Sequence, residues 1–350
     1  MGAIPTTIDQ ITPAWLSEAT GLGVEAAEVE QIGVGIGVSS ALYRLHLTGS
    51  GCPATVVVKL PALAEEAVFT STVLRMYTRE AGFFRELATE APLRVPGCLH
   101  HSVDPDTSHF VLVMEDLGSL RPVDQVVGMA VGDAERAVDG LARWHATWWG
   151  RADGLAESGL TVSLGDEIYK AVLPMVFGEG WDKMLAEGVP VPAALQDVAP
   201  RWSAAMPRLL DGLAAAPTTM IHGDYRADNL FFDDDDGQVA TVDFQLIGTG
   251  HGAYDLAYFV TQSLTSADAA AHERSLFDRW AGALERHGVS GDELAGAWDA
   301  YRAAALFCLV YPVVAWRGMD VTDPRQLGLA TTMLERFDRA VAALDLADLL

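Results

Sequence analysis

The chain has 350 residues, half of them hydrophobic and a fifth charged, a composition that supports a large buried core and argues against disorder. Its length exceeds what one hydrophobic core usually holds, so two packed lobes are expected. It carries 23 Lys and Arg against 48 Asp and Glu, which gives a formal net charge of −25. So acidic a chain would repel a phosphate backbone, and a nucleic-acid partner is not expected.

Three features of the sequence bear on cellular location. Cys52, Cys98 and Cys308 are widely spaced and form no Cys-x-x-Cys pair, which predicts reduced thiols. The first residues lack the basic and apolar regions of an export signal. The longest uncharged apolar run, 303–316, contains Pro312; it is too short to span a bilayer and predicts a buried helix. We therefore expect a cytoplasmic protein with no membrane partner.

The first third of the chain is expected to be mostly β. Apolar and polar residues alternate over 43–47, which is the period of a half-buried strand. Residues 54–60 form a β-branched strand that carries one lysine, Lys59. A further strand, His109–Glu115, follows. Two helices are predicted in this region, a short one opening at Thr12-Pro13 and a longer one over 72–90.

The strand that runs into Asp116-Leu117-Gly118 is a natural crossover, so the predicted domains are residues 1–116 and 117–350. The second is expected to be largely helical, apart from one short β region, 219–244, whose run of four aspartates and Gly237 predicts a hairpin turn. The fold class is therefore α+β, with a small β lobe and a large helical lobe that contains an embedded hairpin. The predicted helices of the second lobe cover roughly 133–149, 166–177, 200–215, 253–287, 291–317 and 324–345.

The residues that could perform chemistry stand at the ends of the short strands within 219–244. Asp224 and Asn229 are five residues apart across a tight loop, and Asp243 ends the returning strand. Phosphoryl transfer needs a carboxylate for the acceptor hydroxyl, oxygens that hold Mg²⁺ against the phosphates, and a basic group that steadies the nucleotide. Asp224 can be the first, Asn229 with Asp243 the second, and Lys59 the third.

These residues carry a resemblance to a known family. His222-Gly223-Asp224 with Asn229 resembles the catalytic loop HGDxxxxN of the aminoglycoside phosphotransferase and choline-kinase-like superfamily, whose members share the protein-kinase-like fold. The resemblance runs from about residue 33 to 258, in the expected order, and is greatest to the ecdysteroid-kinase-like (CHK-kinase-like) branch. The other matching segments are Val57-Val58-Lys59, Arg79-Glu80, Leu112-Val113-Met114-Glu115-Asp116-Leu117 and Val242-Asp243-Phe244-Gln245.

The resemblance implies a bilobal protein-kinase-like fold, with an antiparallel first lobe, and a set of roles. Asp224 would act as the base, Asn229 and Asp243 would coordinate Mg²⁺, and Lys59, positioned by Glu80, would contact the ATP phosphates. The remaining predicted nucleotide-binding groups are a flap containing Gly35, Gly37 and Ser39, and the backbone of Glu115 and Leu117 at the adenine edge. The implied activity is ATP-dependent phosphorylation of a hydroxyl on a small molecule (an aminoglycoside, a choline-like compound or another alcohol) by a monomer or homodimer.

Several residues have alternative interpretations. The segment after Gly33 does not fit a dinucleotide-binding GxGxxG motif, because the third position falls on Val38 or Ser40 and a strand follows; an ordinary β-turn stays open. Lys59, taken alone, could be a strand-edge or snorkelling residue. Glu86 competes with Glu80, because six residues rotate a helix face only modestly.

Two other functions are considered. A catalytically silent nucleotide-binding regulator of the same fold is the main alternative, and the retention of Lys59, Asp224, Asn229 and Asp243 argues against it. A metal-dependent hydrolase built from His222, Asp224, Asp243 and His251 is disfavoured, since the sequence has no HExxH motif. Asp255 is expected to be a capping or loop-bracing carboxylate, and His222 is expected to hold the loop. Asp228 is a loop brace or a surface residue. The residues that could face a substrate are Tyr225, Arg226, His251 and Trp316.

Overall fold

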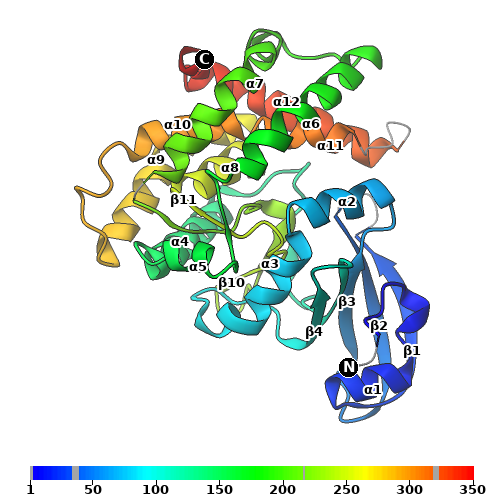
Figure 1. Cartoon of the computed structure of the whole chain (residues 1–350). Helices are drawn as coiled ribbons and strands as arrows, with labels where there is room; N and C mark the ends of the chain where they lie inside the picture. Colours follow the sequence, from blue (N-terminus) through cyan, green and yellow to red (C-terminus); the bar gives the residue numbers. More distant parts are fainter. Residues whose placement is uncertain (1–2, 34–38, 216, 318–322) are drawn as a thin grey trace. The chain divides into compact units, whose positions relative to one another are not determined.

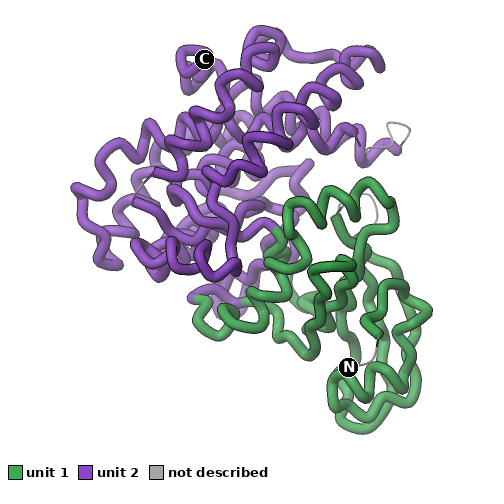
Figure 2. The backbone as a smooth tube through the Cα atoms, viewed as in Figure 1, with its two compact units in different colours: residues 1–91, 95–120, 242–245 green, residues 92–94, 121–241, 246–350 purple. Residues whose placement is uncertain are grey.

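The computed structural model describes residues 3–33, 39–215, 217–317 and 323–350 (Figure 1). They form two compact units, each built from more than one stretch of sequence (Figure 2). Unit 1 consists of Met1–Ala91, Val95–Leu120 and Val242–Gln245; unit 2 consists of Pro92–Arg94, Arg121–Thr241 and Leu246–Leu350. The boundary between two lobes after residue 116 stays a prediction. In the structure, the segment Val242–Gln245 belongs to the same compact unit as the N-terminal part of the chain.

Unit 1 is built on a five-stranded antiparallel sheet with the order β1-β2-β3-β5-β4. Its strands are β1 (Gly23–Ile32), β2 (Ser40–Ser50), β3 (Thr55–Pro61), β4 (Cys98–Asp104) and β5 (His109–Glu115). Val56 and Val58 of the central strand β3 point into a core that also contains Leu16 of helix α1 (Pro13–Thr20). Successive side chains of a strand alternate between faces, so Lys59 points to the opposite face of the sheet.

The helix predicted over 72–90 is broken in the structure. α2 (Glu65–Val73) ends early, α3 (Met76–Gly82) starts after a short break, and a wider π-helical turn follows over Phe83–Leu87. Arg75, in the break, has a left-handed φ of 55°. The buried Arg79 donates its Nη2 to the carbonyl oxygen of Leu74 at 2.8 Å. The buried Arg79 side chain thus provides a hydrogen-bond donor for a carbonyl oxygen at the break. Helical periodicity cannot predict such a contact.

Unit 2 is mainly helical. Its helices are α4 (Val131–Trp148), α5 (Asp153–Glu157), α6 (Glu167–Ala186), α7 (Ala193–Ala214), α8 (Ala253–Ser263), α9 (Ser266–Arg286), α10 (Ala297–Phe307), α11 (Val310–Trp316) and α12 (Pro324–Ala343). The predicted helix 253–287 is split at Thr265, whose side chain caps α9 by accepting from Asp268 N. The predicted helix 291–317 is split before α11, where Pro312 has no N–H to donate to the carbonyl four residues earlier. Within the described parts of the chain, every helix is too short or too polar to cross a lipid bilayer.

Two three-stranded sheets of short strands interrupt these helices. β9 (Leu230–Phe232) and β10 (Val239–Thr241) pair as the predicted hairpin, and β6 (Arg121–Pro122) extends it. β8 (Thr219–Ile221) pairs with β11 (Gly248–Gly250), which also pairs with β7 (Val162–Ser163). The buried Trp144 of α4 donates its Nε1 to Met220 O at 2.8 Å. Helix α4 therefore anchors the strand that leads directly into the segment 222–229.

Candidate active site

Lys59 is the centre of a buried charged set in unit 1. Only 3% of the residue is exposed, and its Nζ lies 2.8 Å from the Glu80 carboxylate and 3.1 Å from Asp243 Oδ1. Because β3 is an inner strand of the sheet, Lys59 is neither an edge residue nor a snorkelling one. The competing glutamate, Glu86, is exposed and pairs with Arg85 instead.

The electrostatics of this set follow from its burial. Burial lowers the pKa of Lys59, but the carboxylates of Asp243 and Glu80 raise it more, so the ammonium stays charged well above neutral pH. Burial raises the pKa of Glu80 to about 7, against the lowering effect of Lys59. Burial of an unpaired ammonium would cost a large free energy of desolvation. The carboxylates of Glu80 and Asp243 therefore stabilise the buried cation.

The backbone at Asp243 is held in an uncommon conformation. Asp243 has a φ of 68°, a left-handed value that costs a residue with a Cβ about 1–2 kcal/mol. The next residue anchors it, because Phe244 N donates to Glu80 Oε1 at 3.2 Å and the Phe244 ring stacks on Phe83 at 3.8 Å. Strain of this kind is retained where the surroundings impose it, and here it directs the Asp243 carboxylate to Lys59.

Ser39, predicted to lie in the phosphate flap, is bound to the same segment. Its Oγ donates to Gln245 Oε1 at 2.6 Å, and Gln245 Nε2 donates to Ser40 Oγ at 2.6 Å. Gln245 therefore connects the start of β2 with the Asp243 segment. The predicted flap residues Gly35 and Gly37 lie outside the described residues.

The two predicted adenine-contacting residues of the connector after β5 differ in whether their backbone N–H already has an acceptor in the protein. The N–H of Glu115 donates to Gly97 O at 2.7 Å, so this donor is already used within the protein. The N–H of Leu117 has no acceptor among the described residues, although the residue is buried. Asp116 turns away to bind Arg44 at 2.7 Å. Of the two backbone N–H groups, only that of Leu117 is therefore without an acceptor among the described residues.

In unit 2, Asn229 is hydrogen-bonded directly to Asp224. Asn229 Nδ2 donates to the Asp224 backbone oxygen at 2.9 Å and to its Oδ2 at 2.8 Å. With the amide nitrogen turned to Asp224, Asn229 Oδ1 is directed elsewhere and has no hydrogen-bond partner among the residues that the structure describes. A neutral amide oxygen in this orientation is a chemically suitable ligand for Mg²⁺.

Arg226 is the cation of the loop. Its Nε lies 3.1 Å from Asp224 Oδ1, and its Nη1 donates to Asp228 Oδ2 at 2.9 Å and to Gln125 Oε1 at 2.6 Å. Burial lowers the pKa of Arg226, but Asp224 above all raises it well beyond its ordinary value. From the sequence, Arg226 was only one of four residues that could face a substrate. The available signal was a cation two residues from each of two carboxylates, Asp224 and Asp228.

Asp255 holds the start of the loop through backbone hydrogen bonds. Its fully buried carboxylate accepts from the N–H of His222 at 2.7 Å and from that of Gly223 at 2.9 Å. His145 Nε2 lies 3.0 Å away; its Nδ1 accepts from Trp280 Nε1, so Nε2 carries the proton and donates to Asp255. The predicted loop-bracing role of Asp255 is therefore confirmed.

His222 and Gly223 fit the loop in different ways. The N–H of Asp224 donates to His222 Nδ1 at 3.3 Å, while the other ring nitrogen lies 3.2 Å from Thr241 Oγ1. Gly223 has a φ of 84°, and a Cβ there would lie 2.2 Å from Leu246 O. The prediction that His222 holds the loop is confirmed, and position 223 requires glycine.

Two tyrosines that our sequence reasoning did not assign contact the loop. Tyr311 donates to Gly223 O at 2.7 Å, and its ring stacks on Tyr258 with centroids 4.2 Å apart. Burial, and then the charge of Asp224, raise the pKa of Tyr258 well above its ordinary value. Both phenols therefore stay neutral and can act as donors.

The two histidines of the hydrolase alternative, His222 and His251, form hydrogen bonds within the protein. His251 Nδ1 accepts from Ala253 N at 3.1 Å, and burial lowers the pKa of His251 to about 4. Across the described ranges, no group of three or more His, Cys, Asp or Glu side chains is arranged to hold a metal ion. The predicted Mg²⁺ ligands are instead one amide and one carboxylate, a donor set that fits a cation whose other ligands are phosphate oxygens and water.

Solved structures of low sequence identity share this fold. Aminoglycoside 2'-phosphotransferase-IIIa, in its GDP complex, is 13% identical with a TM-score of 0.58, covering 92% of this chain and 95% of its own. Choline kinase from Cryptosporidium parvum Iowa II is 10% identical with a TM-score of 0.57, covering 93% and 91%. Amicoumacin kinase, in complex with AMP-PNP, Ca²⁺ and Ami, is 12% identical with a TM-score of 0.57, covering 95% and 94%. The predicted bilobal protein-kinase-like fold is confirmed.

The sequence itself identifies the family. No curated protein sequence matches the chain significantly. The model of the family described as "Phosphotransferase enzyme family" matches residues 30–304, which is most of the chain. The predicted superfamily is thereby confirmed, whereas the closer likeness to the ecdysteroid-kinase-like branch stays a prediction. This chain belongs to the phosphotransferase enzyme family.

Proposed function

We propose that the protein transfers the γ-phosphoryl group of ATP to a hydroxyl of a small molecule, with Mg²⁺ as the metal. The observation that carries the proposal is the loop carboxylate Asp224, which is bound by Arg226 and Asn229 yet retains partial exposure. A carboxylate that its neighbours hold in place and that solvent still reaches is suited to meet an acceptor hydroxyl. Phosphoryl transfer depends mainly on positioning and charge stabilisation, which a rigid, multiply bonded carboxylate provides.

In this proposal Asp224 accepts the hydrogen bond of the acceptor hydroxyl and, late in the transfer, its proton. Arg226 keeps the carboxylate ionised, and Asn229 fixes its rotamer through Oδ2. These two contacts leave the carboxylate little freedom to turn away from the acceptor. Orientation of this kind is a large part of the rate enhancement available to a kinase.

The nucleotide would be held by residues of unit 1. Lys59 would contact the α- and β-phosphates, and the Leu117 N–H would donate to the adenine edge, with a carbonyl of the connector, that of Glu115, as acceptor. Ser39 would contribute to the phosphate flap. Asn229 and Asp243 would hold Mg²⁺, which when bound neutralises developing charge on the transferred phosphoryl group. The raised pKa of Lys59 supports this, because a protonated ammonium is the group that a phosphate oxygen would meet.

The acceptor is proposed only by class, as a hydroxyl-bearing small molecule such as an aminoglycoside, a choline-like compound or another alcohol. The structural neighbours include proteins named for an aminoglycoside, choline and amicoumacin. The net charge of −25 favours a cationic acceptor through long-range attraction.

ADP release measured across a panel of such acceptors, with ATP and Mg²⁺, tests the proposal. We expect release that depends on Mg²⁺ and on at least one acceptor, and that falls about 10²- to 10⁴-fold in Asp224→Asn. Asp235→Asn, in the exposed hairpin turn, is the matched control and should retain full activity. Nucleotide binding without turnover by any acceptor would instead support the silent regulator, and turnover without nucleotide would refute both.

A further inference from the structure

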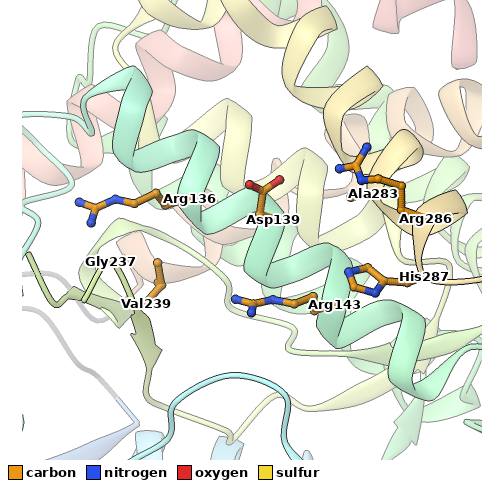
Figure 3. A pocket seen from close by; sticks show the side chains of 8 residues that line it. All are labelled: Arg136, Asp139, Arg143, Gly237, Val239, Ala283, Arg286 and His287. Atoms are coloured by element: carbon orange, nitrogen blue, oxygen red, sulfur yellow. The ribbon is translucent and has the colours of Figure 1, made fainter. Parts of the chain in front are cut away.

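A hollow of about 330 Å³ lies on unit 2, and none of the predicted site residues lines it (Figure 3). Helix α4, the C-terminal end of α9 and the β9–β10 hairpin form its walls. Basic side chains dominate the lining: Arg136 and Arg143 project from α4, and Arg286 and His287 from the end of α9. We call this hollow the arginine pocket. Its size is at the lower end of the range of small-molecule sites, about 300–1,000 Å³.

The charges in the arginine pocket are incompletely neutralised. Arg136 is paired with Asp133 and Asp234. Arg143 and Arg286, by contrast, make no side-chain hydrogen bond or ion pair with any described residue.

The one acidic residue of the lining does not neutralise them. Asp139 is bound by Arg279 at 2.7 Å, in a bidentate pair. Asp139 therefore does not offset the charges of Arg143 and Arg286.

This situation is unusual in the chain. With 48 acidic residues against 23 basic ones, a randomly placed cation would readily find a carboxylate. Among the Lys and Arg side chains that the structure describes, Arg75 is the only other one without a hydrogen bond or ion pair to a described residue. Two of the three such cations thus face one hollow, which indicates that their partner is a molecule outside the chain.

The chemistry of that molecule follows from guanidinium geometry. Each guanidinium presents a planar fork of N–H donors that binds phosphate or carboxylate oxygens in a bidentate manner. The aliphatic side chains of the lining are those of Val239 of β10 and Ala283 of α9. We propose that the arginine pocket binds a small anion that carries at least two phosphate or carboxylate groups.

Such an anion would connect three elements. β9 begins directly after Asn229, and β10 ends two residues before Asp243. A ligand held between α4, α9 and this hairpin would therefore stabilise unit 2 and the hairpin in particular, and it would raise the midpoint of thermal unfolding by mass action. The inference is independent of the phosphotransfer reaction.

Isothermal titration calorimetry of the full chain at low ionic strength, without nucleotide or metal, tests the inference. The probes are pyrophosphate and citrate, which separate phosphate from carboxylate recognition. Inorganic phosphate, which has a single phosphate group, is the comparison. The pocket variant is Arg143→Gln with Arg286→Gln; the control is Arg201→Gln with Arg274→Gln, two exposed arginines on α7 and α9. Both variants lose the same charge, and none of the four residues is buried, so folding should be retained.

We expect pyrophosphate, citrate or both to bind, and the pocket variant to weaken binding by about tenfold or more for each arginine removed. The control should stay within about twofold of wild type, since only long-range charge is altered. Absence of binding by both pyrophosphate and citrate, equal binding by the pocket variant and wild type, or an equal loss in the control would each overturn the proposal.

Discussion

The interior of unit 2 contains a carboxylate whose replacement should be costly although the change in shape is small. Asp255 is fully buried and accepts three hydrogen bonds, from the N–H of His222, the N–H of Gly223 and His145 Nε2. Asp255→Asn replaces one acceptor oxygen with an NH₂ group, so at least one of these donors will face another donor. Loss of a hydrogen bond to a charged group costs about 1.5–3 kcal/mol, and an orphaned buried donor about 1–3 kcal/mol more.

The free energy of unfolding of unit 2 should therefore fall by about 3–5 kcal/mol in Asp255→Asn. Urea unfolding followed by tryptophan fluorescence measures it, because Trp144 and Trp280 lie in the same interior. Asp235→Asn makes the same chemical change at the exposed hairpin turn and should stay within about 0.5 kcal/mol of wild type. If Asp255→Asn is within about 1 kcal/mol of wild type at an unchanged urea slope, the loop is not held by this carboxylate and the bracing argument is wrong.

Three further substitutions test other parts of the structure. Gly223→Ala should destabilise the chain by about 3 kcal/mol or more, because the new Cβ would lie 2.2 Å from Leu246 O at a φ of 84°; a thermal midpoint equal to wild type would contradict this. Lys59→Met should weaken binding of a fluorescent ATP analogue about 10- to 100-fold with the fold retained by circular dichroism, and unchanged affinity would exclude Lys59 from the nucleotide site. His251 has a folded pKa of about 4, below its usual 6.5, so its contribution to stability is complete above pH 6.5 and is lost as the pH falls towards 4. His251→Asn, whose Oδ1 can replace Nδ1 as acceptor, should therefore reduce the loss of unfolding free energy between pH 7 and 4 by about 3 kcal/mol, and parallel pH curves for the two proteins would refute this.

The sequence predicted the elements whose signals are local. Alternation over 43–47 and the β-branched run 54–60 correspond to parts of β2 and β3, and the aspartate-rich turn joins β9 to β10. Capping residues such as Thr12 were also readable, since its side chain accepts from Trp15 N at the start of α1. Signals of this kind act within a few residues, so no tertiary information is needed to recognise them.

What could not be predicted depends on contacts between distant residues. The break before α3 involves the buried Arg79, whose partner Leu74 O is close in sequence but whose burial is a tertiary effect. Tyr311 contacts Gly223 across 88 positions, and no spacing rule connects them. Strand β4, Cys98–Asp104, has weak alternation and becomes a strand through its pairing with β5. The periodicity of apolar residues indicates which face of an element is buried, but it does not indicate which other element packs on that face.

The partners of Asp224 also indicate what kind of base this carboxylate can be. Arg226 at 3.1 Å and the Asn229 amide at 2.8 Å both favour the ionised form, and whatever stabilises a carboxylate also weakens it as a proton acceptor. An early, strong proton abstraction is thus a poor match for this group. A loose phosphoryl-transfer transition state makes no such demand, because the acceptor hydroxyl loses its proton late, after the phosphoryl group has largely left ADP. In the proposed reaction, hydrogen bonds that lower the basicity of Asp224 are compatible with catalysis, and their main effect would be to hold its oxygens where an acceptor hydroxyl must point.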